Sequence, residues 1–432
     1  MTLLPRRSFL AASAGAALAP ELWGADPAKR LKVAAVYTVL RHRSHAQNIL
    51  ENFLQPYLFN GKIVDPGMDV VSFFADQRVA EGDRTDEIAS KFKIPVHKTI
   101  REALTLGGKN LACDAVLLIG EHGDYPTNKL GQMEYPRKRF FDEIVATMRA
   151  SDRSVPVFND KHLSYRWDWS KAMYDTAAKH RIPLMAGSSV PLGQRVPVLE
   201  LPANPEIEDI VSVHGGGPES YDFHAFEVLQ SLIEGRKGGE TGIASVEFLK
   251  GDAMWKAGDA GRWSVALAKL AMSAELGEKV GNLREKIGTE PGDAHVLLIT
   301  YKDGLKASVL KFGKSSNRWN VALKLKNEAK PRHTKIFNGP WGNRNLFMAL
   351  SHAIQEFFRT GKPPYPVERT LLASGVVDAA MHSMADGKLV ATPQLEMRYD
   401  AKDFRAFREM GESWKIVEKR TEDKHLHTLG QK

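Results

Sequence analysis

The feature that most constrains the fold is an alternation of strands and helices along the first half of the chain. The clearest strand is DAVLLIG at Asp114–Gly120, an apolar run typical of a strand that is buried on both faces. Strands and helices that alternate at this spacing predict a parallel, doubly wound sheet. The predicted strands lie at 31–39, 68–75, 94–97, 114–120, 155–158 and 183–187, and the predicted helices at 45–58, 85–92, 99–106, 135–149 and 169–180.

The second half of the chain groups its strands together. Lys302-Asp303-Gly304 is a good hairpin turn between two apolar segments. This grouping predicts an α+β domain with an open, mainly antiparallel sheet. We therefore predict a Rossmann-like domain over 26–195 and an α+β domain over 196–432. The predicted strands of the second domain lie at 243–249, 295–301, 307–312 and 319–326, and its predicted helices at 345–359 and 366–386.

Length and composition agree with two domains and limit the partners. A chain of 432 residues exceeds the size at which one hydrophobic core usually stops growing. The formal charge is +8, but 60 basic residues are interleaved with 52 acidic ones, so no nucleic-acid partner is expected. Cys113 is the single cysteine, so the fold cannot depend on an internal disulfide.

The N-terminal segment predicts export. Arg6-Arg7 precede a short stretch of mostly small apolar residues that ends at Ala19, which is the pattern of a twin-arginine signal. A permanent membrane anchor needs about 20 apolar residues, so this stretch is too short to be one. We expect 1–25 to be a signal peptide and the protein to be periplasmic, without a membrane anchor.

The turn after the first strand contains no glycine, although a helix follows it. Dinucleotide-binding turns use glycines there because a Cβ keeps the backbone away from the pyrophosphate. The side chains of Arg41 and Arg43, with the helix N-terminus near Ser44, could still hold a pyrophosphate. Asp76, after the second long strand, could accept ribose hydroxyls or equally cap a helix. The turn could also hold part of a carbohydrate or contact a neighbouring subunit.

Polar residues also follow the strand DAVLLIG directly. Because the carboxyl ends of parallel strands form the ligand-binding edge of such a sheet, we assign Glu121 and His122 to cofactor binding. The histidines at 162, 214 and 224 could join them around a metal ion. Their spacing matches no known metal motif, so no metal site is predicted.

Two longer segments carry a resemblance to a known family. VPVFNDKHLSYRWDWSKAMYDTAAKHRIPLMAG at 155–187 looks like a Glu-Lys-Pro segment with its following helix and strand, and 352–390 is similar to a pair of closing helices. On these segments the chain resembles the Gfo/Idh/MocA family of glucose-fructose oxidoreductase and inositol dehydrogenase relatives, as a divergent member without the glycine-rich fingerprint. The resemblance implies a nucleotide-binding domain joined to a substrate domain, bound NAD or NADP, and a homo-oligomer associated through the open sheet.

The resemblance also implies roles for individual residues. Lys161 matches the lysine of the Glu-Lys-Pro motif, with Asp160 in place of the glutamate and His162 in place of the proline. Such a lysine can donate a hydrogen bond to a substrate hydroxyl or shuttle its proton. The alternative is a surface lysine that pairs with Asp160.

A second candidate lies in HGGGPESYDFHAFEVLQ at 214–230. The family often places an aspartate four residues before a histidine that acts as acid or base. His224 aligns with that histidine and Glu227 with a following acidic position, but the nearest aspartate, Asp222, is only two residues away. That spacing puts Asp222 on another helical face, where it could equally be an N-cap. We assign Lys161, His224 and Asp222 as the catalytic residues.

These assignments predict an exported oxidoreductase that acts on a hydroxyl of a sugar or a sugar-derived molecule. His224 would remove the hydroxyl proton, Lys161 would polarise the same oxygen, and hydride would pass to tightly bound NAD(P). The alternative is a relative without a nucleotide that binds carbohydrate or performs acid–base chemistry such as elimination or hydrolysis. The missing glycines favour this alternative.

Overall fold

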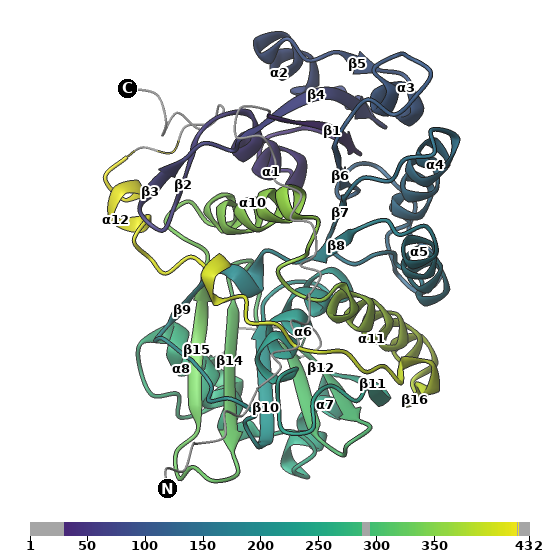
Figure 1. Ribbon diagram of the computed structural model, residues 1–432. Coiled ribbons are helices and arrows are strands. Elements are labelled where there is room, and N and C mark those ends of the chain that lie inside the picture. Colours follow the sequence, from purple (N-terminus) through teal and green to yellow (C-terminus); the bar gives the residue numbers. More distant parts are fainter. Residues whose placement is uncertain (1–29, 287–293, 421, 423–432) are drawn as a thin grey trace, which may run out of the picture.

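The first of two sheets in the computed structural model is a six-stranded parallel sheet (Figure 1). The model describes residues 30–286, 294–420 and 422, so the predicted signal peptide lies outside the described residues. The strand order β5-β4-β1-β6-β7-β8 is the Rossmann order, and the predicted doubly wound sheet is confirmed. The elements are β1 (Leu31–Tyr37), α1 (His45–Leu54), β4 (Met68–Ala75), α2 (Thr85–Phe92), β5 (Val96–His97), α3 (Ile100–Thr105), β6 (Ala115–Ile119), α4 (Arg137–Ala150), β7 (Val157–Asp160), α5 (Trp167–Lys179) and β8 (Leu184–Gly187).

The second sheet has eight strands in the order β16-β11-β12-β13-β10-β14-β15-β9. Strands β10 and β13 are parallel and the other neighbours are antiparallel, which confirms an open, mainly antiparallel sheet. Its elements are β9 (Gln194–Val196), β10 (Ile207–His214), α6 (Ser220–Ile233), β11 (Ile243–Lys250), α7 (Asp252–Asp259), α8 (Val265–Leu276), α9 (Leu283–Lys286), β12 (His295–Tyr301), β13 (Lys306–Lys311), β14 (Trp319–Leu325), β15 (Arg332–Phe337), α10 (Asn343–Thr360), α11 (Val367–Asp386) and β16 (Val390–Ala391).

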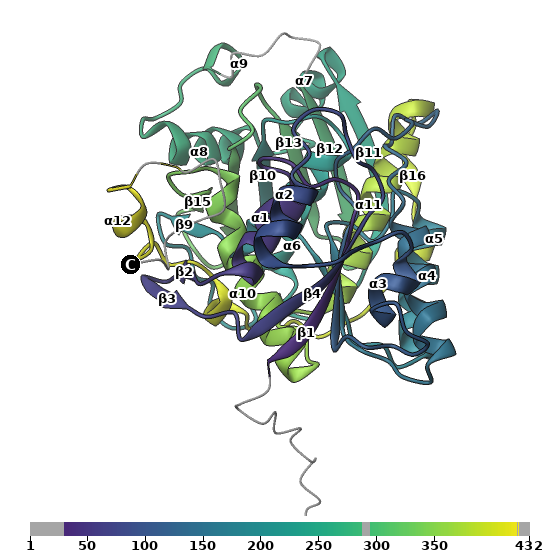
Figure 2. The ribbon, with the colours of Figure 1, turned by 90° about the horizontal axis from the view of Figure 1, so that it is seen from above.

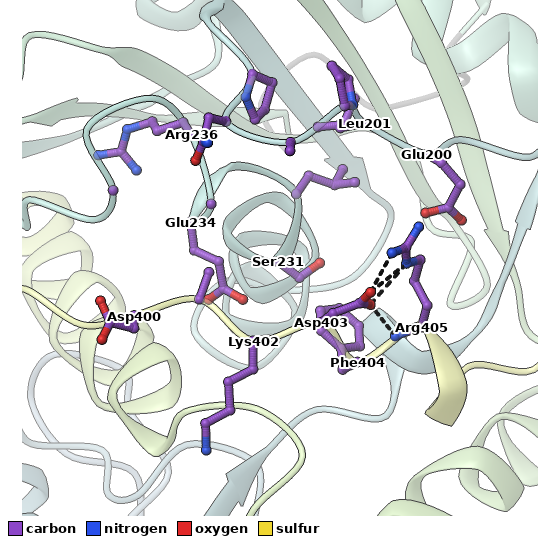
Figure 3. A pocket seen from close by; sticks show the side chains of 18 of the residues that line it. Glu200, Leu201, Ser231, Glu234, Arg236, Asp400, Lys402, Asp403, Phe404 and Arg405 are labelled. Atoms are coloured by element: carbon purple, nitrogen blue, oxygen red, sulfur yellow. Dashed lines mark hydrogen bonds and ion pairs between the residues drawn. The ribbon is translucent and has the colours of Figure 1, made fainter. Parts of the chain in front are cut away.

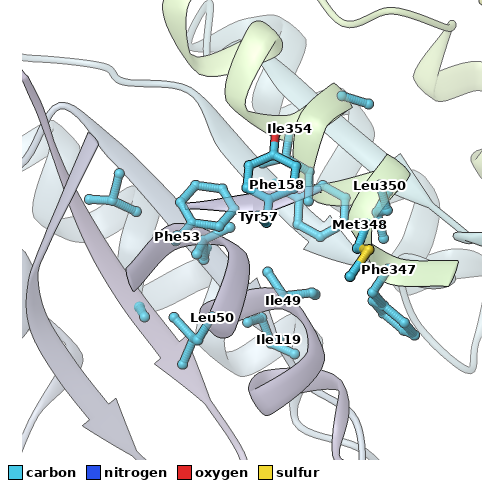
Figure 4. Packing of buried hydrophobic residues seen from close by; sticks show 14 of the residues in the cluster. Ile49, Leu50, Phe53, Tyr57, Ile119, Phe158, Phe347, Met348, Leu350 and Ile354 are labelled. Atoms are coloured by element: carbon cyan, nitrogen blue, oxygen red, sulfur yellow. The ribbon is translucent and has the colours of Figure 1, made fainter. Parts of the chain in front are cut away.

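Helices α6, α10 and α11 lie between the two sheets (Figure 1). Helix α10 belongs to the second half of the chain but packs against α1 and the first sheet. Figure 4 shows Ile49 and Phe53 of α1 facing Met348 and Ile354 of α10. These side chains are at most 1% exposed, so the two halves share one apolar core at this contact.

The second sheet is covered by helices on both faces. Its face opposite α6 and α11 is covered by α7 and α8, for which no helix was predicted. Leu267 and Met272 of α8 form a buried cluster with Val211 and Val213 of β10. This face is already buried by the chain itself, so association through it would first require α8 to be displaced.

The predicted helix at 45–58 ends early, at Leu54. The residue before a proline disfavours the helical conformation, and Gln55, which precedes Pro56, is extended. The chain then forms the hairpin β2 (Tyr57–Phe59) and β3 (Lys62–Val64). Asn60 and Gly61 both have positive φ, as a two-residue hairpin turn requires. Within the described residues, we find no helix that combines the length and the apolar character needed to cross a bilayer.

Candidate functional site

The candidate site is built around a buried lysine at the carboxyl edge of the first sheet. Lys161 directly follows β7 and is 2% exposed. Its Nζ donates to Oε1 of Glu121, which follows β6, over 2.8 Å. An unpaired buried cation would be costly, so the position of this carboxylate determines where the ammonium group lies.

Glu121 bridges two cations. Its second oxygen accepts from Arg137, the first residue of α4, whose side chain is fully buried. Burial alone would raise the pKa of Glu121, but the charges of Lys161 and Arg137 outweigh this effect and hold the pKa well below its usual value. Glu121 is therefore an ionised counter-ion, a role that differs from the predicted contact with a cofactor.

The backbone at Lys161 is strained. Its φ is +62°, a region that a side chain with a Cβ rarely adopts. Its amide donates to the carbonyl of Gly187 at the end of β8 over 3.2 Å, which helps to hold this conformation. Strain of this kind persists where the surroundings enforce it and is concentrated at functional sites.

Helix α6 brings a second group to Lys161 from the other half of the chain. Ser220, the first residue of α6, accepts a hydrogen bond from Lys161 Nζ. His224 lies one turn further on the same face of the helix. Burial, followed by the charges of Lys161 and His45, lowers the pKa of His224 well below 6.5. The imidazole is therefore neutral at neutral pH and close to the ammonium group.

The structure does not bring Asp222 into this site, which corrects the sequence-based assignment. Residues two apart on a helix point to different faces, and Asp222 points to its own sheet. Its Oδ1 lies 2.9 Å from Nε2 of His214 and 2.9 Å from Nε2 of His295. The position four residues before His224 is held by Ser220, a residue that the sequence analysis did not select.

The buried group His214, Asp222 and His295 has the composition of a metal site. However, the amide of Gly216 donates to His214 Nδ1 over 3.3 Å, so this nitrogen carries no proton. The neutral ring then carries its proton on Nε2, the atom that faces Asp222. A metal ligand needs a free lone pair at that atom, so the contacts favour a hydrogen-bonded group over a metal site.

The two arginines of the glycine-free turn after β1, Arg41 and Arg43, have different surroundings. Arg43 is bonded to both carboxylate oxygens of Glu422 at 2.7 and 2.8 Å and to Asn343 of α10, so its guanidinium is engaged within the protein. This finding corrects its assignment to a pyrophosphate. Arg41 is exposed, and its guanidinium makes no hydrogen bond or ion pair within residues 30–286, 294–420 and 422. Ser44 is the N-cap of α1 and accepts from Gln47 N.

The N-terminus of α1 is covered by a side chain. The first helical amide, that of His45, donates to Nδ1 of His122 over 3.4 Å. The His45 ring in turn lies 2.6 Å from Asp160 Oδ2 and packs on Phe347 of α10. Burial, followed by the neighbouring His45, lowers the pKa of His122 to about 4. A neutral imidazole therefore lies where a Rossmann fold places a pyrophosphate.

The carboxylate of Asp76 is also hydrogen-bonded within the protein. Its two oxygens accept from Arg139, on α4, and from Tyr125, in the loop after β6, the latter over 2.7 Å. Gln77 binds the same loop through both backbone groups of Asp124, over 2.7 and 2.8 Å. The predicted contact of Asp76 with a ribose is thus replaced by contacts with this loop.

An NAD-type nucleotide does not fit these groups as they stand. The turn lacks a backbone cradle, since Val39 and Leu40 are fully buried there. His122 covers the helix N-terminus, and Tyr125 covers Asp76. Of the side chains assigned to the phosphates, that of Arg41 remains exposed. A nucleotide could bind only after the loop after β6 had moved.

Three residues that matter here escaped the sequence analysis. Arg137, Ser188 and Ser220 become functional candidates only through their buried partners Glu121, His224 and Lys161. A position four residues before His224 was a usable signal for Ser220, because that spacing shares a helical face. No local pattern marks the other two.

A surface pocket lies away from this site. It has a volume of about 600 Å³ and is lined by the end of α6 and the C-terminal segment. Several of its charged groups are paired within the protein: Figure 3 shows Asp403 bonded to Arg405, and Glu234 accepts from Arg369. Lys161 and His224 do not line this pocket.

Comparison with solved structures identifies the fold. No protein-family model matches the sequence, and no curated protein matches it either. Myo-inositol 2-dehydrogenase from Lactobacillus plantarum is similar over 84% of this chain and 99% of its own, with 13% identity and a TM-score of 0.53. Myo-inositol dehydrogenase from Lactobacillus casei, in complex with NAD(H) and myo-inositol, covers 87% of this chain and 100% of its own, with 14% identity and a TM-score of 0.54.

GenD2 from gentamicin A biosynthesis, in complex with NAD, is similar over 87% of this chain and 99% of its own. Its identity is 13% and its TM-score 0.55. The chain therefore has the fold of these dehydrogenases, and the resemblance to the Gfo/Idh/MocA family is confirmed at the level of the fold.

The partly buried position of His122 predicts how the free energy of unfolding depends on pH. In the unfolded chain this residue binds a proton below about pH 6.5, and in the folded chain it does so only below about pH 4. Acidification through this pH range therefore favours unfolding. When the pH falls from 7 to 5, the free energy of unfolding measured with urea should decrease by about 1–2 kcal/mol more in wild type than in His122→Gln. His382→Gln, at a half-exposed histidine, is the control and should behave like wild type. Equal losses in wild type and His122→Gln would contradict the burial of this imidazole.

Proposed function

We propose that this chain is an oxidoreductase that acts on a hydroxyl group of a sugar or a related polyol. The observation that carries the proposal is the bond of Lys161, at the carboxyl edge of a Rossmann sheet, to Ser220, which lies one helical turn before His224 in the other half of the chain. Ligands bind at this edge in open α/β folds. Solved proteins of the same fold include dehydrogenases with NAD(H) and inositol bound, which supports this reaction and a polyol substrate.

The roles of the two residues follow from their contacts. A substrate hydroxyl that replaces the Ser220 hydroxyl would accept a hydrogen bond from Lys161 Nζ. The bond to Glu121 orients that ammonium group. His224 is neutral and has no described partner on Nε2, so it can accept the hydroxyl proton. General base catalysis of this kind contributes about 10²- to 10⁴-fold to a rate.

An NAD-type nucleotide would supply the hydride acceptor. Because the described groups do not fit it, we derive no step through the nucleotide. Its binding to this chain requires that His122 leave the α1 N-terminus and that the bond between Tyr125 and Asp76 open.

The covered helix N-terminus favours a second candidate function. A relative that no longer binds a nucleotide could use the same lysine and histidine for proton transfer without redox chemistry. Elimination of water from a sugar acid needs such a pair, with one group that removes a proton and one that assists the leaving hydroxyl. The contacts that His122 and Asp76 make within the protein support this candidate.

Replacement of the two central residues tests both candidates. Lys161→Met and His224→Gln should each lower turnover at least about 100-fold while the circular dichroism spectrum is kept. Lys171→Met and His382→Gln, at partly exposed side chains, should keep the wild-type rate. Turnover that survives in both central variants would remove the proposed pair.

Nucleotide content separates the two candidates. Protein purified from its native host without added cofactor should release an NAD-type nucleotide on denaturation, at up to one molecule per chain, as detected by mass spectrometry. Calorimetric titration of the stripped protein with NAD and NADP measures binding directly. Absence of nucleotide in both experiments, with turnover retained, would leave the non-redox candidate.

We also propose that the protein is exported to the periplasm. The proposal rests on the twin-arginine pattern at Arg6 and Arg7. The variant Arg6→Lys with Arg7→Lys should remain in the cytoplasm as an uncleaved precursor, whereas wild type should be found in the periplasmic fraction. An unchanged distribution on cell fractionation would contradict export by this route.

A further inference from the structure

The hydroxyl of Ser188 is the hydrogen-bond partner of Nδ1 in the ring of His224. Ser188 follows β8 and is 2% exposed. Its Oγ is hydrogen-bonded to Nδ1 of His224 and also accepts from the amide of Val190 over 3.0 Å. In the described part of the chain no residue is bonded to Nε2 of His224, so that nitrogen is the one available to a ligand.

The position of Ser188 is itself held by a buried acid. Glu227, one turn after His224 on α6, accepts from the amide of Ser188 over 2.6 Å. The same carboxyl group lies 2.6 Å from Oγ1 of Thr370, on α11. Gly187, just before Ser188, has φ of +136°, and a Cβ there would lie 2.9 Å from Thr370 Oγ1. This packing leaves Ser188 a small range of positions.

A hydroxyl at Nδ1 does not select a tautomer. It can donate to a bare Nδ1, and it can accept from a protonated one, because a serine carries both a proton and lone pairs. In the first case Nε2 carries the proton and cannot accept one from a ligand. In the second case Nε2 has a free lone pair and His224 is a base. In both states Ser188 Oγ can also accept the hydrogen bond from the amide of Val190.

His214 in the same domain shows the opposite arrangement. The amide of Gly216 can only donate to its Nδ1, and the carboxylate of Asp222 can only accept from its Nε2. Both contacts require the same tautomer, so this histidine is restricted to one state. The protein therefore contains one restricted histidine and one whose partner permits both states.

We propose that Ser188 is a positioning residue that holds the His224 ring by Nδ1 and accepts Nδ1–H in the tautomer whose Nε2 can act as a base. In the forward direction the substrate hydroxyl proton moves to Nε2, and the resulting imidazolium donates its Nδ1–H to Ser188 Oγ. In the reverse direction the same proton returns to the substrate oxygen. The catalytic meaning rests on the function proposed above, whereas the two tautomers exist without any substrate.

Nitrogen NMR of the full-length protein tests the tautomers without relying on activity. With ¹⁵N-histidine labelling, the signals of His224 are assigned by their loss in His224→Gln. In wild type the ¹⁵N chemical shifts of His224 should lie between those of the two pure tautomers. The chemical shifts of His214 should match those of the Nε2–H tautomer alone. Ser188→Ala should shift the His224 signals toward one tautomer. Ser189→Ala, at the neighbouring buried serine, should leave them unchanged.

Kinetics test the catalytic role. With the polyol that wild type turns over, Ser188→Ala should lower kcat about tenfold or more at an almost unchanged KM and should move the pH profile. Ser188→Thr, which keeps the hydroxyl, should restore most of the rate, and Ser189→Ala should match wild type. An equal loss in Ser188→Thr would mean that the effect is packing alone and would overturn the role.

The two experiments fail in different ways. A single His224 tautomer in wild type, unchanged in Ser188→Ala, would overturn the inference whatever the enzyme does. If wild type has no turnover with any sugar or polyol tested, the proposed function fails, while the NMR result still decides whether Ser188 permits both tautomers.

Discussion

The candidate site depends on one buried carboxylate, that of Glu121. Its two oxygens bind Lys161 and Arg137, which follow β7 and begin α4. Without it both cations would be buried and unpaired, a loss that typically costs several kcal/mol. Through the bond of Lys161 to Ser220, this group of charges also reaches α6 of the second half of the chain. The position of the lysine, its charge and its contact with the other domain therefore share one cause.

A second buried pair fixes how the two halves meet. Arg344 of α10 binds Glu51 of α1 over 2.9 Å, with neither side chain exposed. The apolar core shown in Figure 4 joins the same two helices. Helix α1 is thereby held in place along its length, and His45 at its start is packed on Phe347. The helix end that binds phosphates in other Rossmann folds is here part of a domain contact, which explains why the fold of a dehydrogenase and a closed nucleotide edge coexist.

The fold was largely predictable, and the site only in part. Continuous apolar strands and periodic helices are local signals, so the Rossmann order followed from them. Lys161 and His224 were selected because each lies near the start or end of an element in a recognisable segment. Arg43 and Asp76 were placed wrongly, since their partners Glu422 and Arg139 lie far away in sequence or on another element. Asp222 was chosen as the nearest acid, although the helical period made Ser220 the residue that shares a face with His224.

The amino-acid sequence alone determined the two kinds of sheet, the lysine at the end of β7 and the histidine in the first turns of α6, because periodicity and position within an element are properties of neighbouring residues. Only the tertiary structure decided which groups meet them. The counter-ion Glu121, the hydroxyl of Ser188 and the covering of α1 by His122 all arise from contacts between segments that chain order does not relate. Burial then changed the charge states, since desolvation and nearby cations act through space and leave no mark in the sequence.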